Sequence, residues 1–423
     1  MTLDLRVLRR SEYDSWHEAL ELAFGGVEGN VGNTDLLRDL TEIDRSIAVW
    51  DGDECVGTTG AYSFRLSVPG GAQVPTAGVT MVSVAATHRR RGVLTSMMRR
   101  QLDDVRSWGE PLAVLTASEP AIYGRYGYGV ASHALSAEID TSRVRIRIPG
   151  NGDGTGDGTG DGTGDDIRLR RVKADDPAVR EACEALYAAD VAKRPGMPAR
   201  RPGWERLPVV GTGVSRDGRS GLQCVLAERD GEVVGFTLFH NRPEWDMAGP
   251  KGTVELADLH AADPVAYATL WRFLAGIDLT SSIRVRSRPV DDPFRYLVSD
   301  PRRCELRVRD DLYLRPVEVA PALEARTYRT PVDVVLEVTD AFCPWNEGRW
   351  RLSGDPKGAS CARTADAPDL VMSVNELSAV YLGGTSLDAL ARAGRVREVR
   401  AGALDAASVA FGSDIAPWLP HGF

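Results

Sequence analysis

Alternating apolar and polar positions open the chain. In residues 3–7 every second side chain is apolar, which predicts a half-buried strand, and in residues 12–24 the apolar spacing lengthens to three or four, which predicts a helix. Two further apolar runs, 47–50 and 55–68, flank the turn Asp51-Gly52-Asp53. Because two runs around such a turn are typical of paired strands, we expect a β-hairpin there.

A strand, a helix and a strand follow. The first strand ends at Val84, apolar residues then recur every three or four positions from Val93 to Val105, and the run 112–115 is apolar throughout. The recurrence predicts a helix with one apolar face, and the short run is typical of a buried parallel strand. We therefore expect a strand-helix-strand unit.

A similar order recurs later in the chain. The segment 167–172 predicts a strand, 179–192 a helix, and 233–239 a strand after the turn 229–232. Between residues 254 and 273 a strand again meets a helix, but this junction contains no run of glycine and arginine. We expect the second junction not to bind what the first one binds.

The C-terminal part, from about residue 312, predicts a small α+β domain. Apolar residues alternate in 332–338, a strand follows at 350–352, and helical spacing appears at 374–381 and 387–393. The chain then ends on the apolar, proline-bearing sequence APWLPHGF, which is unlike a frayed polar terminus.

The length and one low-complexity segment set the expected domain limits. A chain of 423 residues exceeds what one hydrophobic core usually organises. The repeated Gly-Asp-Gly-Thr of residues 152–166 has no apolar side chain to bury, which predicts a linker, and it lacks the glutamate that an EF-hand calcium loop needs. We expect domains at 1–150, 167–311 and 312–423, with the linker at 151–166.

Composition and charge narrow the class of protein. The 43% hydrophobic and 26% charged residues are those of a globular protein, and the net charge of -9 disfavours nucleic-acid binding and suits a cationic substrate. The six cysteines form no Cys-x-x-Cys pair, so neither a metal site nor a disulfide framework is expected. No segment has the roughly 20 apolar residues of a membrane span, and we expect a cytoplasmic protein without membrane contact.

The strongest chemical signal is Arg89-Arg90-Arg91-Gly92-Val93-Leu94, at the junction of the strand and the helix. Unpaired backbone N–H groups at a helix start carry the positive end of the helix dipole, glycine permits close approach, and arginines pair with phosphates. The alternative is a basic helix start on a solvated face, which the helix dipole disfavours. The pattern therefore favours a pyrophosphate site.

Three segments carry a resemblance to a known family. The strand Val82–Val84 followed by RRRGVL resembles the pyrophosphate loop R/Q-x-x-G-x-G/A of GNAT acetyltransferases, although Leu94 replaces the usual small residue. The longer strings VSVAATHRRRGVL, PTAGV and LTASEPAIYGRYGYG are similar to those of the Eis (enhanced intracellular survival) family of GNAT N-acetyltransferases. This resemblance covers essentially the whole chain.

The resemblance implies an α+β fold: two tandem GNAT folds, the second degenerate, followed by a sterol-carrier-like domain. It implies acetyl-CoA as cosubstrate, no metal, and a homo-hexamer. In the family, the strand valines matching Val82 and Val84 pair with the pantetheine arm and the loop holds the pyrophosphate. The cofactor-binding residues implied here are Val82, Val84, Arg89, Arg90, Gly92, Val93, Leu94 and Ser118.

The resemblance also implies two groups for proton transfer. Tyr123 matches the family's general acid, which protonates the departing thiolate. From the residues alone, Tyr123, Tyr126 and Tyr128 are equal candidates, and each could be a core aromatic. The family uses its C-terminal carboxylate as general base, which here belongs to Phe423; the alternative is a disordered terminus.

The predicted function is acetyl transfer from acetyl-CoA to primary amines of aminoglycosides and similar polycations. A protein-lysine acetyltransferase and, from another class, a lipid carrier built on residues 312–423 remain the alternatives. The acidic residues of the acceptor pocket are not placed, because the segment 25–35 diverges from the family pattern.

Overall fold

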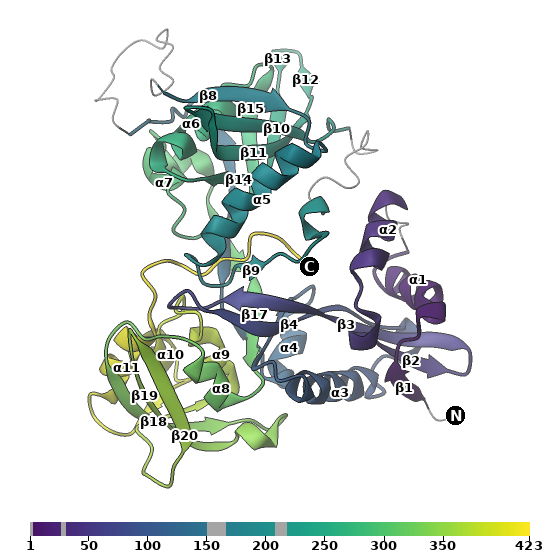
Figure 1. The fold of residues 1–423 in the computed structure, drawn as a ribbon, viewed down its shortest axis with the longest axis vertical. Coiled ribbons are helices and arrows are strands. Elements are labelled where there is room, and N and C mark those ends of the chain that lie inside the picture. The colour runs from purple at the N-terminus through teal and green to yellow at the C-terminus, as the bar shows by residue number, and fades with distance from the viewer. Residues whose placement is uncertain (1–2, 27–30, 150–165, 208–217) are drawn as a thin grey trace. The chain divides into compact units, whose positions relative to one another are not determined.

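The first and last parts of the chain pack together into one unit. The structure is a computed structural model that describes residues 3–26, 31–149, 166–207 and 218–423 (Figure 1). Contacts divide the chain into unit 1, with Met1–His133, Val191–Arg201 and Asp310–Phe423, and unit 2, with Ala134–Asp190 and Pro202–Arg309. The expected linker lies outside the described residues up to residue 165. The domain limits expected from the sequence stay predictions.

A mixed sheet of unit 1 contains the expected strand-helix-strand unit. The hairpin of β2 and β3 is confirmed by antiparallel pairing, and β4 and β5 are parallel, joined through α3. In order across the sheet, the strands are β1 (Asp4–Val7), β2 (Ile47–Asp51), β3 (Glu54–Ser67), β4 (Gln73–Val84), β5 (Leu112–Thr116), β17 (Leu312–Pro316) and β6 (Gly129–Val130), with β9 (Pro198–Ala199) beside β3. The helices are α1 (Tyr13–Ala23), α2 (Val31–Leu40), α3 (Val93–Ser107) and α4 (Pro120–Tyr123).

The helix α3 is held on this sheet by its apolar stripe. Its buried side chains recur three to five positions apart, which places them on the face that meets the sheet. Met98, Leu102 and Val105 pack with the strands β4 and β5 in one core cluster, while Val93 and Met97 pack with β2 and β3 in another. The helix start is thereby fixed beside the carboxyl end of β4.

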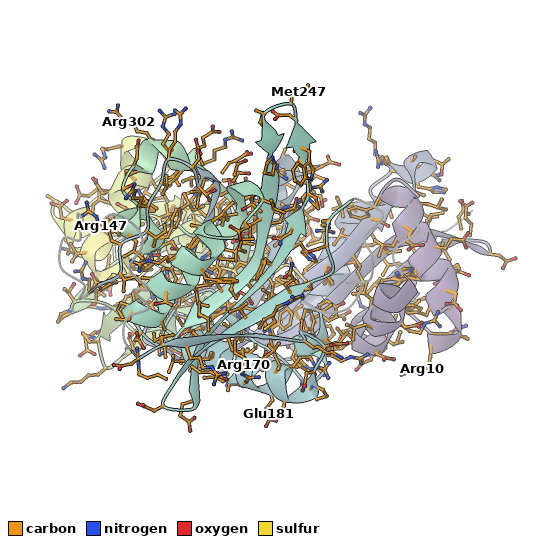
Figure 2. All side chains as sticks on the ribbon, turned by 90° about the horizontal axis from the view of Figure 1, so that it is seen from above. Arg10, Arg147, Arg170, Glu181, Met247 and Arg302 are labelled. Carbon is orange, nitrogen blue, oxygen red and sulfur yellow. The ribbon has the colours of Figure 1, made fainter. Side chains whose placement is uncertain are left out.

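Unit 2 contains a second sheet with the same strand-helix-strand order. α6 packs with β7, β14 and β15 in one core cluster, and α5 packs with β10 and β11 in another. Figure 2 shows the exposed Met247 at the tip of the small hairpin β12–β13. The sheet order is β16 (Arg307–Asp310), β7 (His133–Asp140), β15 (Thr280–Pro289), β14 (Gly252–Ala261), β11 (Glu232–Arg242), β10 (Gln223–Arg229), β8 (Arg168–Val172). The other elements are β12 (Trp245–Asp246), β13 (Gly249–Pro250), α5 (Pro177–Val191), α6 (Pro264–Ala275) and α7 (Phe294–Leu297).

The C-terminal part of unit 1 forms a third sheet covered by helices. Its core is continuous with that of the first sheet, because Leu66 and Leu112 belong to the same buried cluster as Leu336 and Leu419. The sheet order is β20 (Gly358–Arg363), β19 (Gly348–Asp355), β18 (Val332–Thr339), β21 (Leu370–Ser373), β22 (Arg397–Glu398). The helices are α8 (Val319–Glu324), α9 (Val374–Val380), α10 (Leu387–Arg392) and α11 (Ala403–Phe411).

Short 3-10 helices complete the described elements. Two of them lie next to residues of the candidate site. One precedes residues 89–92, which we call the arginine loop, and the other follows Tyr123. They are η1 (Arg10–Glu12), η2 (Ile43–Arg45), η3 (Ala86–His88), η4 (Gly124–Tyr126), η5 (Trp204–Arg206), η6 (Pro301–Cys304) and η7 (Pro344–Asn346).

Candidate active site

The strands β4 and β5 separate toward their carboxyl ends. Their parallel register pairs Gly78 with Val114 as its last pair, whereas β4 continues to Val84. The edge of β4 beyond Gly78 is therefore not paired with β5. Val82 and Val84, both expected at the cofactor, lie on this stretch with half-buried side chains. A strand edge of this kind can pair with an extended amide-bearing ligand through main-chain hydrogen bonds.

A bulge in β4 accompanies this separation. Met81 has a positive φ of 54°, and the register with β3 shifts between Thr58 and Gly60. Thr58 supports the irregular backbone, because its hydroxyl donates a 2.6 Å hydrogen bond to the Met81 carbonyl. Since bulges bend a strand and re-aim its neighbours, this one helps to open the sheet next to the candidate site.

The arginine loop ends in a helix start that no side chain covers. Gly92 is the N-cap of α3, with φ 83° in the left-handed region and no side-chain cap, and a Cβ there would meet nothing within 4 Å. Arg90 also has a positive φ, 62°. Arg89, Arg90 and Gly92 are exposed. The unpaired N–H groups of this helix start and the adjacent arginines together can bind a pyrophosphate.

Val93 and Leu94 face inward from the same helix start. Val93 is buried at 4% exposure, and Leu94 packs partly buried against two core clusters. The departure from the glycine-or-alanine pattern therefore lies on the core side of the helix. The main chain at Gly92 is open, since a Cβ there would meet nothing within 4 Å.

His88 ties the loop to the hairpin. Its Nε2 lies 3.1 Å from a carboxylate oxygen of Asp51, and its Nδ1 lies 2.9 Å from the Thr87 hydroxyl. The ring is buried, at 6% exposure. This arrangement gives His88 a structural role, because the pair fixes the residue that precedes Arg89.

Residues 118–128, which we call the tyrosine loop, follow the carboxyl end of β5. Ser118, expected at the cofactor, lies exposed in the turn before α4, and Tyr123 is the last residue of α4. Burial, and to a smaller extent the neighbouring Tyr126 and Glu119, together raise the pKa of Tyr123 to about 12. The phenol therefore keeps its proton at neutral pH, as a general acid requires.

The three candidate tyrosines differ in what their hydroxyls contact. The Tyr126 hydroxyl lies 3.3 Å from the Thr95 hydroxyl, and the Tyr128 hydroxyl is fully buried without a partner among the described residues. The Tyr123 hydroxyl makes no hydrogen bond to a described residue and is not among the fully buried oxygens. Its ring contacts that of Tyr128 edge to face at 6.0 Å. Tyr123 is thus the candidate best placed to donate to a ligand.

The C-terminal residue lies on β4. The Thr80 hydroxyl donates a 3.0 Å hydrogen bond to the main-chain oxygen of Phe423, and the Phe423 ring contacts Phe64 edge to face at 5.1 Å. Upstream, the Trp418 amide donates to the Pro195 carbonyl at 2.9 Å. Arg194 donates to the Ala416 carbonyl at 2.7 Å. The tail is therefore held along its length, and its last carboxylate lies on the strand that carries Val82 and Val84.

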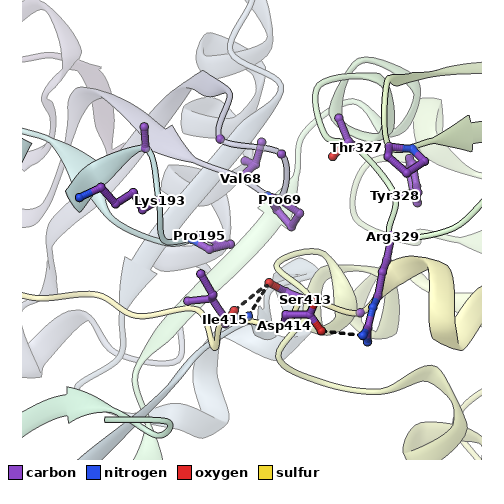
Figure 3. Close-up of a pocket in the computed structure, with 15 residues that line it drawn as sticks. Val68, Pro69, Lys193, Pro195, Thr327, Tyr328, Arg329, Ser413, Asp414 and Ile415 are labelled. Carbon is purple, nitrogen blue, oxygen red and sulfur yellow. Dashed lines mark hydrogen bonds and ion pairs between the residues drawn. The ribbon is translucent and has the colours of Figure 1, made fainter. Parts of the chain in front are cut away.

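A cavity of about 360 Å³ marks where the tail leaves the C-terminal part (Figure 3). Arg329 and Asp414 form an ion pair of 2.7 Å at its edge, and the Ser413 hydroxyl donates to the Ile415 carbonyl. Lys193 and Pro195 line it from the segment that holds the tail. Its lining includes neither the arginine loop nor the tyrosine loop, so it is distinct from the candidate active site.

The corresponding helix start in unit 2 is already filled. Asp263 is the N-cap of α6, and its carboxylate accepts hydrogen bonds from the amides of Val265 and Ala266 at 2.9 and 3.0 Å. Pro264 removes a further N–H, and Arg229 pairs with the Asp263 carboxylate at 2.7 Å. A phosphate would have to displace an internal anion. This agrees with the expectation that the second junction does not bind what the first one binds.

Neither a metal centre nor a membrane-spanning helix is found among the residues that the structure describes. Among those residues, no group of three or more His, Cys, Asp and Glu side chains is placed to hold a metal ion. None of the helices described is both long enough and apolar enough to cross a membrane.

Comparison with known proteins defines the class. Residues 4–131 and 196–316 each match a family described as an acetyltransferase (GNAT) domain, and residues 319–420 match a sterol carrier protein domain. The chain is therefore a GNAT acetyltransferase with two GNAT domains followed by a sterol-carrier-like domain, which confirms the fold class expected from the sequence.

Individual relatives show to which family of GNAT acetyltransferases the chain belongs. An uncharacterized N-acetyltransferase of Streptomyces avermitilis is 63% identical over 423 residues, covering 100% of both chains. N-acetyltransferase Eis of Mycobacterium tuberculosis is 31% identical, covering 95% of this chain and 96% of its own. The crystal structure of Eis1 from Mycobacterium abscessus has a TM-score of 0.81 and 31% identity, covering 100% of both chains. The chain belongs to the Eis family of N-acetyltransferases, as the resemblance implied, and acetyl transfer is its reaction.

Two residues of this region were not expected from the sequence. Thr80 holds the oxygen of Phe423, but a threonine inside a strand carries no signal for a partner so distant along the chain. Asp263 fills the helix start of unit 2, and here a signal was present, since Asp-Pro before an apolar helix predicts an N-cap followed by proline at the first turn.

Proposed function

We propose that this acetyltransferase acts on primary amines of aminoglycosides and similar polycationic small molecules. Tyr123 is the general acid and the carboxylate of Phe423 is the general base. The observation that carries the proposal is the Tyr123 hydroxyl, which has a raised pKa and no hydrogen bond to another described residue. Tyr123 follows β5 in the chain and lies beyond the point where β4 and β5 separate.

The cosubstrate acetyl-CoA supplies the acetyl group as a thioester. The main chain of β4 near Val82 and Val84 would pair with the pantetheine amides. The helix start at Gly92, with Arg89 and Arg90, would hold the pyrophosphate. Val93 and Leu94, whose side chains face the core, would contribute their main-chain amides, and the exposed Ser118 completes the proposed cofactor contacts.

The remaining residues move protons. An ammonium group must lose a proton before its nitrogen can attack, and the Phe423 carboxylate, held by Thr80, takes that proton directly or through water. As the C–N bond forms and the C–S bond breaks, the Tyr123 hydroxyl gives its proton to the sulfur. The second proton that the nitrogen loses on becoming an amide passes through water to the tyrosinate and restores the phenol, and the proton held by Phe423 leaves to solvent. The products are an amide, a thiol and one proton released to solvent.

A lipid-carrier role has less support. The interior of the C-terminal part is filled by packed side chains, among them the fully buried Arg326. Its guanidinium lies 5.0 Å from the Phe411 ring centre and donates to the carbonyls of Phe411 and Tyr381. A bound lipid would place its acyl chain beside this buried charge, which is energetically costly.

A thiol-release assay with acetyl-CoA tests the proposal. Aminoglycosides, linear polyamines and a lysine-containing peptide are the acceptors, and mass spectrometry identifies the product. We expect aminoglycosides to give the highest kcat/KM. A higher kcat/KM for the peptide would instead assign the chain to protein-lysine acetylation.

The assembly and location are part of the same proposal. From its family membership we infer a homo-hexamer in the cytoplasm. Sedimentation velocity of the purified chain tests the assembly, and a species smaller than a hexamer at working concentration would contradict it.

A further inference from the structure

The main chain directly after Tyr123 is held by side chains from the C-terminal part of the chain. Four carbonyls of the tyrosine loop, those of residues 124, 126, 127 and 128, accept hydrogen bonds from three side chains. Asn375 donates to Gly124 at 2.7 Å and to Tyr128 at 2.9 Å, and Arg315 donates to Tyr126 at 2.6 Å. The Ser378 hydroxyl lies 3.0 Å from the Gly127 carbonyl and 2.6 Å from the Val374 carbonyl, so these two oxygens share its single proton.

The contact is too close for any residue other than glycine at two positions. A Cβ at Gly127, which has φ 84°, would lie 1.4 Å from a guanidinium nitrogen of Arg315. A Cβ at Gly129 would lie 2.2 Å from the Asn375 carbonyl and 2.8 Å from the Ala379 amide. The glycines of the sequence YGRYGYG therefore allow α9 to lie directly on the tyrosine loop.

The strongest donor is itself fixed. Arg315 is fully buried, and its second nitrogen donates to Asp340 at 2.6 Å. Asp340 also accepts from Asn346 at 3.0 Å and from the Cys343 amide at 2.9 Å. A buried ion pair with its remaining oxygen satisfied holds a defined geometry, and removing one partner is costly.

The local helical structure of the tyrosine loop is too short to fix its backbone conformation. α4 spans only Pro120–Tyr123 and η4 only Gly124–Tyr126, which is too short for a self-sufficient helix. Ser118, Gly124 and Arg125 are exposed, so burial contributes little at these positions. The rings of Tyr123, Tyr126 and Tyr128 pack in one core cluster, and the hydrogen bonds donated by α9 and β17 fix the main chain that connects these rings.

We propose that Asn375 and Ser378 of α9 are positioning residues for acetyl transfer, acting with Arg315 through the tyrosine loop on Tyr123. This inference rests on the proposed role of Tyr123 as general acid. It gives the C-terminal domain a second task beyond carrying Phe423: the acid is aligned by that domain and not by the GNAT domain alone. A displacement of an acid by about 1 Å can cost about 10²-fold in rate.

The test uses Asn375→Ala and Ser378→Ala in the full chain, with Ser386→Ala as the matched control. Ser386 caps α10 of the same domain by accepting from the Ala389 amide at 3.2 Å and has no bond to the tyrosine loop. We expect each of the first two variants to lower kcat by about 10-fold or more, with KM for acetyl-CoA within about 2-fold. The control Ser386→Ala should keep its kcat even if its melting temperature falls as much as those of Asn375→Ala and Ser378→Ala.

A double-mutant cycle with Tyr123→Phe separates this inference from the proposed function. If Asn375 acts through Tyr123, Asn375→Ala should cost little further rate in the Tyr123→Phe background. The positioning role is overturned if Asn375→Ala and Ser378→Ala keep full kcat, or if Asn375→Ala costs the same factor in both backgrounds. Full activity of Tyr123→Phe alone would overturn the general-acid role, and with it the reason for positioning.

Discussion

The hydroxyl of Thr80 donates a 3.0 Å hydrogen bond to the main-chain oxygen of Phe423. Because hydrogen bonds to a charged group contribute about 1.5–3 kcal/mol, losing this one should misplace or loosen the terminal carboxylate. We expect Thr80→Val to lower kcat by about 10-fold, and Thr80→Ser, which keeps the hydroxyl, to restore most of it. Steady-state kinetics at saturating acetyl-CoA measure this. Full kcat in Thr80→Val, or a loss in Thr80→Ser but not in Thr80→Val, would show that the hydroxyl does not position the carboxylate.

A C-terminal extension tests the same carboxylate independently. Adding a few residues after Phe423 converts the terminal carboxylate to a neutral amide, so we expect turnover to fall by about 10²-fold, the scale for losing a general base. An N-terminal extension of the same length is the control. Full activity in the homogeneous C-terminally extended protein would transfer the base role to another group.

Substituting Tyr123 by phenylalanine removes the proposed acid and leaves the ring. We expect turnover to fall by about 10²-fold or more while affinity for coenzyme A barely changes. Tyr126→Phe is the matched control, since its hydroxyl lies against Thr95 and not toward a ligand. An active Tyr123→Phe together with an inactive Tyr126→Phe would mean that Tyr126 is the acid.

The free energy of unfolding should fall on the alkaline side. Burial raises the pKa of Cys343 to about 11, that of Cys361 to about 12 and that of Tyr123 to about 12, from ordinary values of 9.0 for the thiols and 10.0 for the phenol. Above pH 9.0 the unfolded chain therefore begins to lose protons that the folded chain keeps. This contribution is fully present below that pH and is lost as the pH rises through 12.

Urea unfolding at about pH 8 and about pH 10.5 measures this loss, which amounts to about 1.4 kcal/mol per pH unit for each full proton of difference. Cys361→Ala should start from a lower stability, because it leaves a small cavity, yet it should lose less between the two pH values. A free energy of unfolding that does not change across this interval would contradict the assigned pKa directions.

Local patterns predicted the parts of the site that are close together in sequence. The run from Val84 to Val93 contains the end of a strand, the arginine loop and a helix start, and its chemistry follows from the order of these residues. The hairpin and the parallel strand pair follow from apolar spacing in the same way.

Contacts between distant segments could not be predicted in that way. Thr80 and Phe423 are 343 positions apart, and Asn375 and Gly124 are 251 apart. No period of the sequence relates such residues, because only tertiary packing brings them together. The glycines of YGRYGYG were visible, but which neighbour lies against them depends on where α9 packs.

We expect coenzyme A to bind at the open helix start of Gly92 and not at the start filled by Asp263. Titration calorimetry with coenzyme A measures the number of sites per chain and their affinity, and thermal unfolding shows whether each variant folds. We expect one site per chain, abolished by Gly92→Glu, which puts a negative charge where the phosphates bind, and unchanged in Asp263→Ala. Two sites per chain, or undiminished affinity in Gly92→Glu, would contradict a single coenzyme A site at Gly92.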